Sequence, residues 1–369
     1  MNRFYRFFSS PSSSIASADN TSSSNSKPFI FKYLIDKCNF SETQAQSTST
    51  RLSHIKHPQK PDSVLSLLQH SGFSHTHIQK AIHSTPQILV ADPQKTLKPK
   101  LALLQQQLGL YDSDLGQFVS NNSTFLTMSL EMKLLPCIQT LKKILPDSTH
   151  VIQVLQRCKW IVYKDPAARL LPNISLLQSC GIVESQLSML LKRQPMLFAM
   201  KSDRLQGLVE RVKEMGFSTD SRMFVYALYT VSCMSPERLE RKLELLGRFG
   251  LSREESMAMF RKAPSLMRTS EKKLELGMQC FQSVLGEDRT ALIRCPACLM
   301  YSIEKRVLPR WRVVGILRSK LLLKKDPSFV NVIQISEAEF LRKYILKFGE
   351  VSDELLLAYK GHAFKSYVV

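Results

Sequence analysis

The sequence contains little glycine and lacks a long apolar run. Only 13 of its 369 residues are Gly, about half of the usual ~7%, which argues against glycine-rich phosphate-binding loops and against the many tight turns of an all-β protein. The longest apolar or near-apolar run, Met223 to Met234, has 12 residues, whereas a helix needs about 20 to cross a bilayer. The sequence therefore predicts an all-α chain with no membrane-spanning helix.

Acidic residues are scarce relative to basic ones. The chain has 31 Asp and Glu against 51 Lys and Arg, a formal net charge of +20, while its 44% hydrophobic and 22% charged residues are ordinary for a folded protein. Such an excess of positive charge favours an anionic partner, for example a nucleic acid. The 8 Cys are scattered along a long chain, which predicts reduced thiols rather than the disulfide framework of a small secreted domain.

Residues 1–28 differ in composition from the rest of the chain. They contain ten Ser, two Arg within the first six residues and no acidic residue before Asp19. A cationic, acid-poor, Ser-rich start is typical of organelle transit peptides, and we predict that residues 1–28 are one, removed from the mature protein or disordered in it. Their aromatic and Arg content favours the mitochondrion, with the plastid as the alternative address. The remaining alternative is a Ser-rich tail that carries no targeting signal.

The rest of the chain repeats a short pattern, a Pro followed by an apolar cluster. Copies begin at Pro86, Pro195, Pro264 and Pro296. The first two are 109 residues apart, which divides into three steps of about 36 and predicts degenerate copies near residues 123 and 159. These positions are the anchors of the repeat. A further copy, which lacks Pro, falls near Val231 and brings the anchors to seven. A second Pro stands thirteen residues after four of the seven anchors, at Pro99, Pro136, Pro172 and Pro309.

Each repeat is expected to form two helices joined by a short turn, because apolar residues recur at three- and four-residue spacing on both sides of the anchor. Asp92-Pro93 is a helix start, and several units end their second helix at a glycine. The Pro inside the second helix should bend it. Because one unit cannot bury its own apolar face, we predict an all-α fold, an α-solenoid of about seven to eight helical repeats of 32–37 residues forming a curved crescent. The predicted helix-ending glycines are Gly109, Gly181, Gly216 and Gly250.

The side chains that directly follow the anchors are expected in the core between successive units. An apolar residue at the same place in every unit is more readily explained by packing than by ligand binding. We therefore predict packing, rather than base stacking, for Trp160, Leu197, Phe198, Leu266, Met267 and Leu299.

One segment is more specific than the repeat. It reads Tyr301-Ser302-Ile303-Glu304-Lys305-Arg306-Val307-Leu308-Pro309-Arg310-Trp311-Arg312-Val313-Val314 and is followed by Leu317-Arg318-Ser319-Lys320. Together with the period and the Pro anchors, this segment resembles the mitochondrial transcription termination factor (mTERF) family of plants over residues 62–348. The resemblance implies an organellar protein whose crescent of helical repeats binds nucleic acid along a positively charged groove. The second, third and fifth units lack the anchor Pro of the family pattern.

The chain is accordingly divided into four segments. Residues 1–28 are the predicted transit peptide, residues 29–61 a divergent N-terminal segment, residues 62–330 the mTERF-like helical repeats, and residues 331–369 a C-terminal helical cap.

Basic residues recur at one position of the repeat, two residues before the anchor, where four of the seven units carry Lys or Arg. One position in each unit defines one face of the stack, and a row of cations on that face can follow a phosphate backbone. The alternative is that these residues are solvated surface charges. The row and its basic neighbours, predicted to contact phosphate, are Arg157, Lys192, Arg193, Arg261, Lys262 and Arg294.

A second concentration of cations lies in residues 305–325, which contain no acidic residue. Arg306 and Arg310 are four residues apart and therefore share a helix face, with Trp311 beside them. Solvated helix surface is again the alternative. The predicted nucleic-acid contacts in this segment are Lys305, Arg306, Arg310, Arg312, Arg318 and Lys320.

Patterns that would indicate catalysis or a cofactor are weak. The six His between His54 and His83 lack Cys or carboxylate partners at metal-ligand spacing, and Cys295 and Cys298 coincide with an anchor whose apolar residues are expected in the core. The sequence contains no Walker loop, dinucleotide-binding fingerprint, nucleophile elbow or HExxH motif. We therefore predict no enzyme activity, no catalytic residue, no cofactor and no metal.

These observations favour a nucleic-acid-binding factor that regulates organellar gene expression through transcription, termination or RNA processing such as intron splicing. Phosphate contacts leave DNA and RNA open as targets. The alternative is a helical-repeat scaffold that binds an acidic protein partner, since a basic concave surface also fits acidic peptides. We expect a monomer that needs no membrane and that has organellar proteins as further partners.

Overall fold

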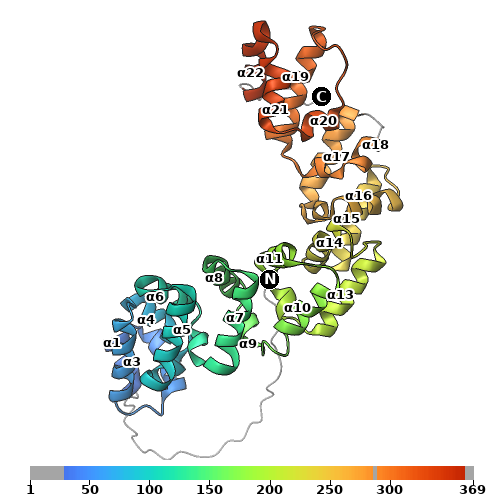
Figure 1. Cartoon of the computed structure of the whole chain (residues 1–369). Coiled ribbons are helices and arrows are strands. Elements are labelled where there is room, and N and C mark those ends of the chain that lie inside the picture. The colour runs from blue at the N-terminus through green and yellow to red at the C-terminus, as the bar shows by residue number, and fades with distance from the viewer. Residues whose placement is uncertain (1–28, 286–288, 362–369) are drawn as a thin grey trace, which may run out of the picture. The chain divides into compact units, whose positions relative to one another are not determined.

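The computed structural model describes residues 29–285 and 289–361, and within them it contains only helices and turns (Figure 1). The predicted all-α fold is confirmed. The predicted transit peptide, residues 1–28, lies outside the described residues, as do residues 362–369 of the predicted C-terminal cap. Within the described part of the chain, no helix is both long enough and apolar enough to cross a membrane.

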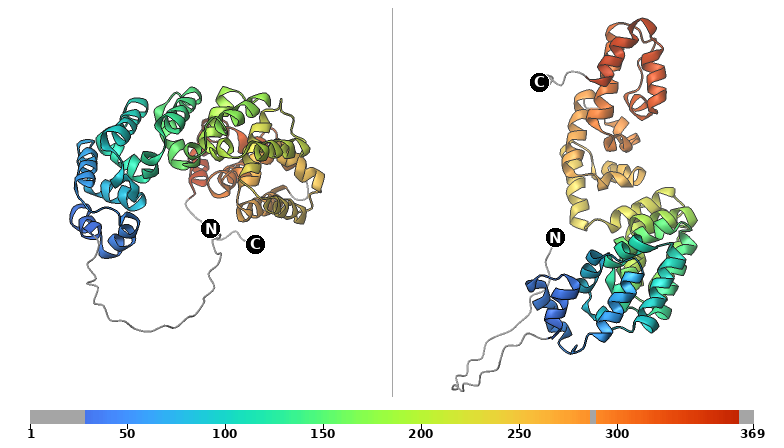
Figure 2. Two further views of the ribbon diagram at one scale, coloured as in Figure 1. Left: turned by 90° about the horizontal axis from the view of Figure 1, so that it is seen from below. Right: turned by 90° about the vertical axis from the view of Figure 1, so that its left-hand side faces the viewer.

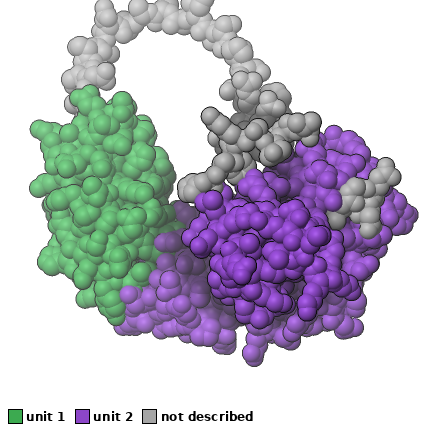
Figure 3. Space-filling view, turned by 90° about the horizontal axis from the view of Figure 1, so that it is seen from above, with its two compact units in different colours: residues 1–102, 110–127 green, residues 103–109, 128–369 purple. Residues whose placement is uncertain are grey.

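The chain divides into two compact units, which Figure 3 colours separately. Unit 1 comprises Met1–Ala102 and Leu110–Thr127, and unit 2 comprises Leu103–Gly109 and Met128–Val369. The helices and the short 3-10 or π turns (η) of unit 1 are α1 (Phe29–Cys38), α2 (Glu42–Ser49), η1 (Thr50–Leu52), α3 (Gln59–His70), α4 (His75–Ser84), η2 (Pro86–Val90), η3 (Pro93–Leu97), the first residues of α5 (Lys98–Leu108), α6 (Asp112–Asn121) and η4 (Ser123–Thr127).

Unit 2 is also helical, and Figure 2 shows its elements from two further directions. They are η5 (Leu130–Leu134), α7 (Leu135–Ile144), α8 (Ser148–Arg157), α9 (Trp160–Tyr163), α10 (Leu170–Ser179), α11 (Glu184–Arg193), α12 (Met196–Ala199), α13 (Ser202–Glu214), α14 (Arg222–Ser232), α15 (Pro236–Arg248), α16 (Arg253–Lys262), η6 (Pro264–Arg268), α17 (Glu271–Leu285), α18 (Thr290–Arg294), η7 (Pro296–Met300), η8 (Ile303–Val307), α19 (Leu308–Ser319), α20 (Phe329–Gln334), α21 (Glu337–Leu341), η9 (Arg342–Leu346), η10 (Gly349–Val351) and α22 (Ser352–Lys360).

The repeat consists of a first helix, a one-turn helix and a longer second helix. One such unit is α11, α12 and α13, and another is α16, η6 and α17. The anchors begin the one-turn helices, as Pro264 does for η6 and Pro296 for η7. The anchors without Pro near residues 123 and 159 also fall at one-turn helices, η4 and α9. The fifth unit differs, because α14 runs through the anchor position and α15 follows without a separate turn.

A π turn precedes the second Pro of the repeat at three of its four positions, and Pro172, near the start of α10, is the exception. Pro99, Pro136 and Pro309 follow such turns, η3, η5 and η8 respectively. In η8 the Val307 amide donates to the Ser302 carbonyl, five residues back. Proline has no N–H, and its ring crowds the carbonyl four residues before it, so the preceding turn widens. In contrast, α13, α15 and α17 lack this Pro and are continuous α-helices.

Local sequence signals set the helix ends. The Asp92 carboxylate accepts hydrogen bonds from the Gln94 and Lys95 amides, which satisfies two of the free N–H groups at a helix start. The four predicted helix-ending glycines all have positive φ angles. After α19 the corresponding position is occupied by Leu321, which has φ 56° and is 90% exposed. A left-handed conformation is unfavourable for a residue with a Cβ atom, so this exposed Leu is strained.

The core lies between the helices, largely at the places that the repeat predicts. Leu197 and Leu266 are fully buried and Leu299 is 1% exposed, as predicted. Phe198 and Met267 are likewise fully buried, and their interpretation as packing residues is confirmed.

The packing interpretation of Trp160 is wrong, because this side chain is 56% exposed. Trp160 stands one residue after its anchor, at a position of the one-turn helix whose side chain points away from the core. The inward places, two and three residues after the anchor, are filled by Ile161 and Val162. In the next unit the residue at the same outward place, Met196, is 42% exposed.

Polar side chains of the second helices join neighbouring repeats. Asn173 Nδ2 donates to three carbonyls at the end of α12, and Lys242 Nζ donates to the Met267 carbonyl of η6 at 2.6 Å. In unit 1, Lys100 Nζ donates to the Leu126 carbonyl at 2.6 Å. The last carbonyls of a helical turn lack intrahelical donors and carry partial negative charge. Some of the excess basic residues therefore hold successive repeats together. Burial lowers the pKa of Lys100 and Lys242.

Candidate nucleic-acid interface

Four cations two residues before the anchors, named here the basic row, are Arg157, Arg193, Lys262 and Arg294. Each is the last residue of the first helix of its unit, and all four are exposed. The structure therefore places them at one repeated position. A cation in the last turn is also favoured by the helix dipole, so the row has a structural role as well.

Two members of the basic row contact the next repeat. Arg157 Nη1 donates to the Lys192 carbonyl at 2.8 Å, and Lys262 Nζ donates to the Ile293 carbonyl at 2.8 Å. Both acceptors lie at the end of the next first helix. Arg193 and Arg294 make no side-chain hydrogen bond or ion pair with other described residues. These two guanidinium groups are the most available members of the row.

The predicted neighbours of the row are less accessible. Lys192 is half-buried; the pKa of Asp147 is lowered mainly by a hydrogen bond from the Thr149 amide, with the Lys192 charge as a smaller contribution. Arg261 is half-buried and packs against Gly216, where a Cβ atom would come within 3.2 Å of the arginine side chain. Both side chains are therefore partly committed to contacts within the protein.

The prediction that Arg310 contacts nucleic acid is wrong. Its side chain is fully buried, and Nη1 donates to the carbonyls of Val332, Ile333 and Ile335 at 2.7–3.2 Å. Nη2 lies 3.2 Å from the Glu337 carboxylate. The carbonyls at the end of α20 need donors, and a planar guanidinium supplies several at once. The face that Arg306 and Arg310 share is internal.

Arg306 and two further predicted cations are also engaged. Arg306 is half-buried, donates to carbonyls at the end of α20 and stacks over the Tyr301 ring at 4.5 Å. Arg318 pairs with Asp326 and stacks over the Trp311 ring at 4.3 Å. Lys320 pairs with Glu354 at 3.0 Å. The segment 305–325 is free of acids, but the fold supplies acids from outside it. Lys305 and Arg312 are exposed.

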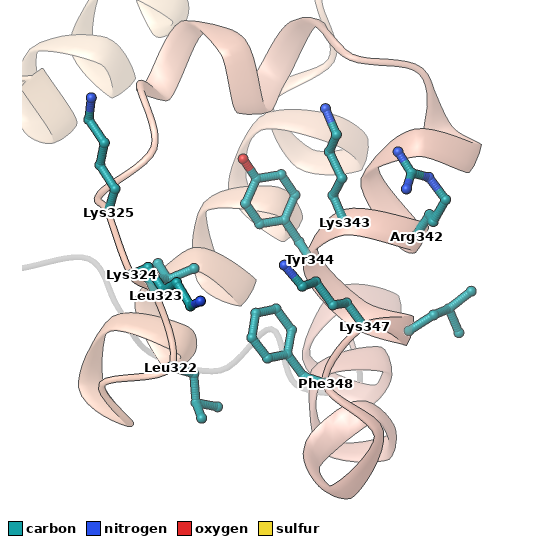
Figure 4. A pocket seen from close by; sticks show the side chains of 10 residues that line it. Leu322, Leu323, Lys324, Lys325, Arg342, Lys343, Tyr344, Lys347 and Phe348 are labelled. Atoms are coloured by element: carbon teal, nitrogen blue, oxygen red, sulfur yellow. The ribbon is translucent and has the colours of Figure 1, made fainter.

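A basic cleft in unit 2 was missed at the sequence level. It is open, has a volume of about 910 Å³ and is lined by residues 322–325, which follow α19, and by residues of η9 and its end. Figure 4 shows the Tyr344 and Phe348 rings between segment 322–325 and the helix that carries Arg342 and Lys347. The lining residues, named here the C-terminal cleft, are Leu322, Leu323, Lys324, Lys325, Arg342, Lys343, Tyr344, Leu346, Lys347 and Phe348.

The charge of the C-terminal cleft is one-sided. Five of the ten lining residues are Lys or Arg, and the lining contains no Asp or Glu. Lys343 pairs with Glu339 at 2.7 Å, whereas Lys324, Lys325 and Lys347 are exposed and form no ion pair with other residues that the structure describes. Lys324 and Lys325 belong to the basic segment 305–325 that the sequence indicated. The signal that was overlooked is the group of basic residues in the predicted cap, Arg342, Lys343 and Lys347, which no repeat position marks.

The weak metal and redox patterns find no geometric support. In the described ranges, no group of three or more His, Cys, Asp or Glu side chains is placed to hold a metal ion. Burial raises the pKa of the Cys298 thiol to about 12, so it forms little thiolate near neutral pH.

Comparison with known proteins identifies the family. The mTERF family model matches residues 65–286 and 168–341, more than half of the chain. The chain belongs to the mTERF family. It is 22% identical over 227 residues to the Arabidopsis thaliana protein "Transcription termination factor MTERF8, chloroplastic". The matched part covers 61% of this chain and 45% of that protein, so the chain spans about half the length of this relative.

Proposed function

We propose that the protein is a non-enzymatic nucleic-acid-binding factor of organellar gene expression. The observation that carries the proposal is the C-terminal cleft, where exposed cations gather without a carboxylate among the lining residues. Cations that contact phosphates release condensed counterions, which supplies affinity for any sequence. The family membership and the name of the relative support this proposal.

The exposed members of the predicted set supply further cations for phosphate contacts. Arg193, Arg294 and Lys305 are the best placed, because they are exposed and their side chains form no hydrogen bond or ion pair with other residues that the structure describes. Arg157 and Lys262 keep exposed surface while they bridge units. Arg310 takes no part, since it is buried.

The favoured step is transcription, and in particular its termination. The relative is named a transcription termination factor, and the name belongs to a protein of which this chain matches 45%. RNA processing such as intron splicing is the alternative role. Nucleic-acid targets of both kinds present the phosphates that the exposed cations fit.

The organelle is proposed from residues 1–28 and from the relative. Their aromatic and Arg content favours the mitochondrion, whereas the relative is named chloroplastic, which favours the plastid. Fusion of residues 1–28 to a fluorescent reporter decides between the two. A reporter that stays in the cytosol contradicts the transit peptide.

The phosphate contacts are tested by titration at several salt concentrations. Arg193→Ala, Arg294→Ala and Lys347→Ala should each weaken binding to every sequence, and each should reduce the slope of log K against log salt by about 0.7–0.9. Arg51→Ala is a matched control, because Arg51 is exposed but lies in unit 1, outside the proposed surface. Unchanged affinity and slope in all three variants would contradict the proposal.

One observation favours a second candidate, an acidic protein partner at the C-terminal cleft. Leu322 is 37% and Leu346 66% exposed beside the lysines, and apolar side chains contribute little to phosphate binding. An acidic segment with apolar residues would cover both kinds of group. Binding of an acidic peptide, with no binding of nucleic acid, would support this candidate instead.

A further inference from the structure

Trp160 and Tyr163 form an exposed aromatic pair in α9. They are 56% and 36% exposed, and their ring centroids lie 5.5 Å apart at an interplanar angle of 47°. Single exposed apolar residues are ordinary on protein surfaces, but adjoining exposed rings are typical of binding surfaces. The core of this turn does not need them, because Ile161 and Val162 already fill it.

Basic residues lie next to this pair. Lys164 Nζ lies 5.5 Å from the Trp160 ring centroid, and Lys133 Nζ donates to the last carbonyl of α9 at 3.3 Å. Arg157 of the basic row precedes Trp160 by three residues, a reach of about 11 Å at most along the chain. The carboxylate that follows, Asp165, is used as a cap, since its Oδ1 accepts a hydrogen bond from a backbone amide of the next turn.

We propose that Trp160 and Tyr163 form a stacking platform for unpaired bases, so that the protein prefers single-stranded nucleic acid to duplex. The inference rests on the nucleic-acid-binding function proposed above. An unpaired base offers a π face to an aromatic ring while its phosphates meet neighbouring cations. In a duplex the base faces are covered by their neighbours, so the rings have nothing to stack on. An acidic peptide would meet the cations and leave the rings uncovered.

Tryptophan fluorescence reports on the platform, because the chain has only 2 Trp. Trp311→Phe keeps an aromatic ring against Phe329, which Trp311 contacts at a centroid distance of 4.7 Å, and leaves Trp160 as the single reporter. We expect a single-stranded RNA of about 12 nucleotides, within the usual site size, to quench the Trp160 emission of the full chain. The same sequence in a duplex should bind without comparable quenching.

Affinity provides the second measurement. Trp160→Ala should weaken single-strand binding about 5- to 140-fold and change duplex binding less than about twofold, with an unchanged melting temperature because the side chain is exposed. Trp160→Phe should retain most of the affinity. Tyr111→Ala is the matched control, since Tyr111 is 58% exposed but lies in unit 1 beside acidic residues.

The outcomes separate this inference from the proposed function. Equal losses for single strand and duplex, no loss for either, or quenching by polyglutamate but not by RNA would overturn the stacking platform. If Trp160→Ala does not change binding while Arg193→Ala lowers the salt slope, the proposed phosphate contacts are supported and the stacking platform is contradicted. If the unmodified protein binds no nucleic acid, both proposals fall.

Discussion

Replacement of Arg310 by Ala measures how far one cation of the basic segment holds the fold. Arg310 is fully buried and donates to three carbonyls at 2.7–3.2 Å. Hydrogen bonds from a charged donor contribute about 1.5–3 kcal/mol each, and a buried carbonyl left without a donor costs about 1–3 kcal/mol. The two hydrogens of Nη1 are shared among the three carbonyls, so the loss corresponds to about two such bonds. The Glu337 contact adds little, because that carboxylate is 58% exposed. We therefore expect Arg310→Ala to destabilise the surrounding helices by about 3–6 kcal/mol.

Amide hydrogen exchange measures this loss where it occurs. A chain of repeats opens locally, so exchange should accelerate in α20 and α21, while the amides of α4 in unit 1 keep their protection. Arg294→Ala is the control, because Arg294 is exposed and its removal should stay within about 0.5 kcal/mol. Arg310→Lys should lie between the two, since an ammonium keeps the charge but loses the planar set of donors.

Unchanged exchange in α20 and α21 of Arg310→Ala would mean that the guanidinium does not satisfy the carbonyls at the end of α20.

Three further predictions concern the repeat and its termini. Leu266→Ala should lower the free energy of unfolding by about 2–5 kcal/mol, because Leu266 is fully buried; an unchanged urea midpoint would contradict the core assignment. Leu321→Gly should raise the stability by up to about 1 kcal/mol, since it relieves the left-handed conformation at φ 56° while it loosens the unfolded chain; a lower melting temperature would speak against strain. Burial raises the pKa of the Cys137 thiol to about 12, so at pH 8 a thiol reagent should label the exposed Cys233 first and Cys137 only after unfolding; simultaneous labelling would contradict this order.

The repeat could be predicted because its signals are local. A glycine after a helix, an Asp before one and a Pro within one act on the backbone of the same few residues. Once the anchor is known, the residues two and three places after it can be assigned to the core. The prediction for Trp160 was wrong because Trp160 stands only one residue after its anchor, where the side chain is exposed. A one-residue difference matters on a one-turn helix, where adjacent side chains point in different directions.

The candidate site was harder to predict, because its determinants lie far apart in the sequence. Arg310 is followed by basic and apolar residues, and the carbonyls that bind it are 22 to 25 residues away. A net count of local charge therefore overstated the cations available to a ligand. The C-terminal cleft was missed for a related reason, since it pairs residues 322–325 with η9, two segments that no period connects.

The hydrogen bonds between units limit how such a chain can change in evolution. Each donor, such as Asn173 or Lys242, lies in one unit and its acceptor carbonyls in the following one. A duplication or loss of one whole repeat leaves every donor opposite an acceptor of the same kind. A break within a repeat leaves a buried amide or ammonium group without its acceptor, which is costly. The repeat is therefore the smallest piece by which the gene can lengthen or shorten while the protein still folds.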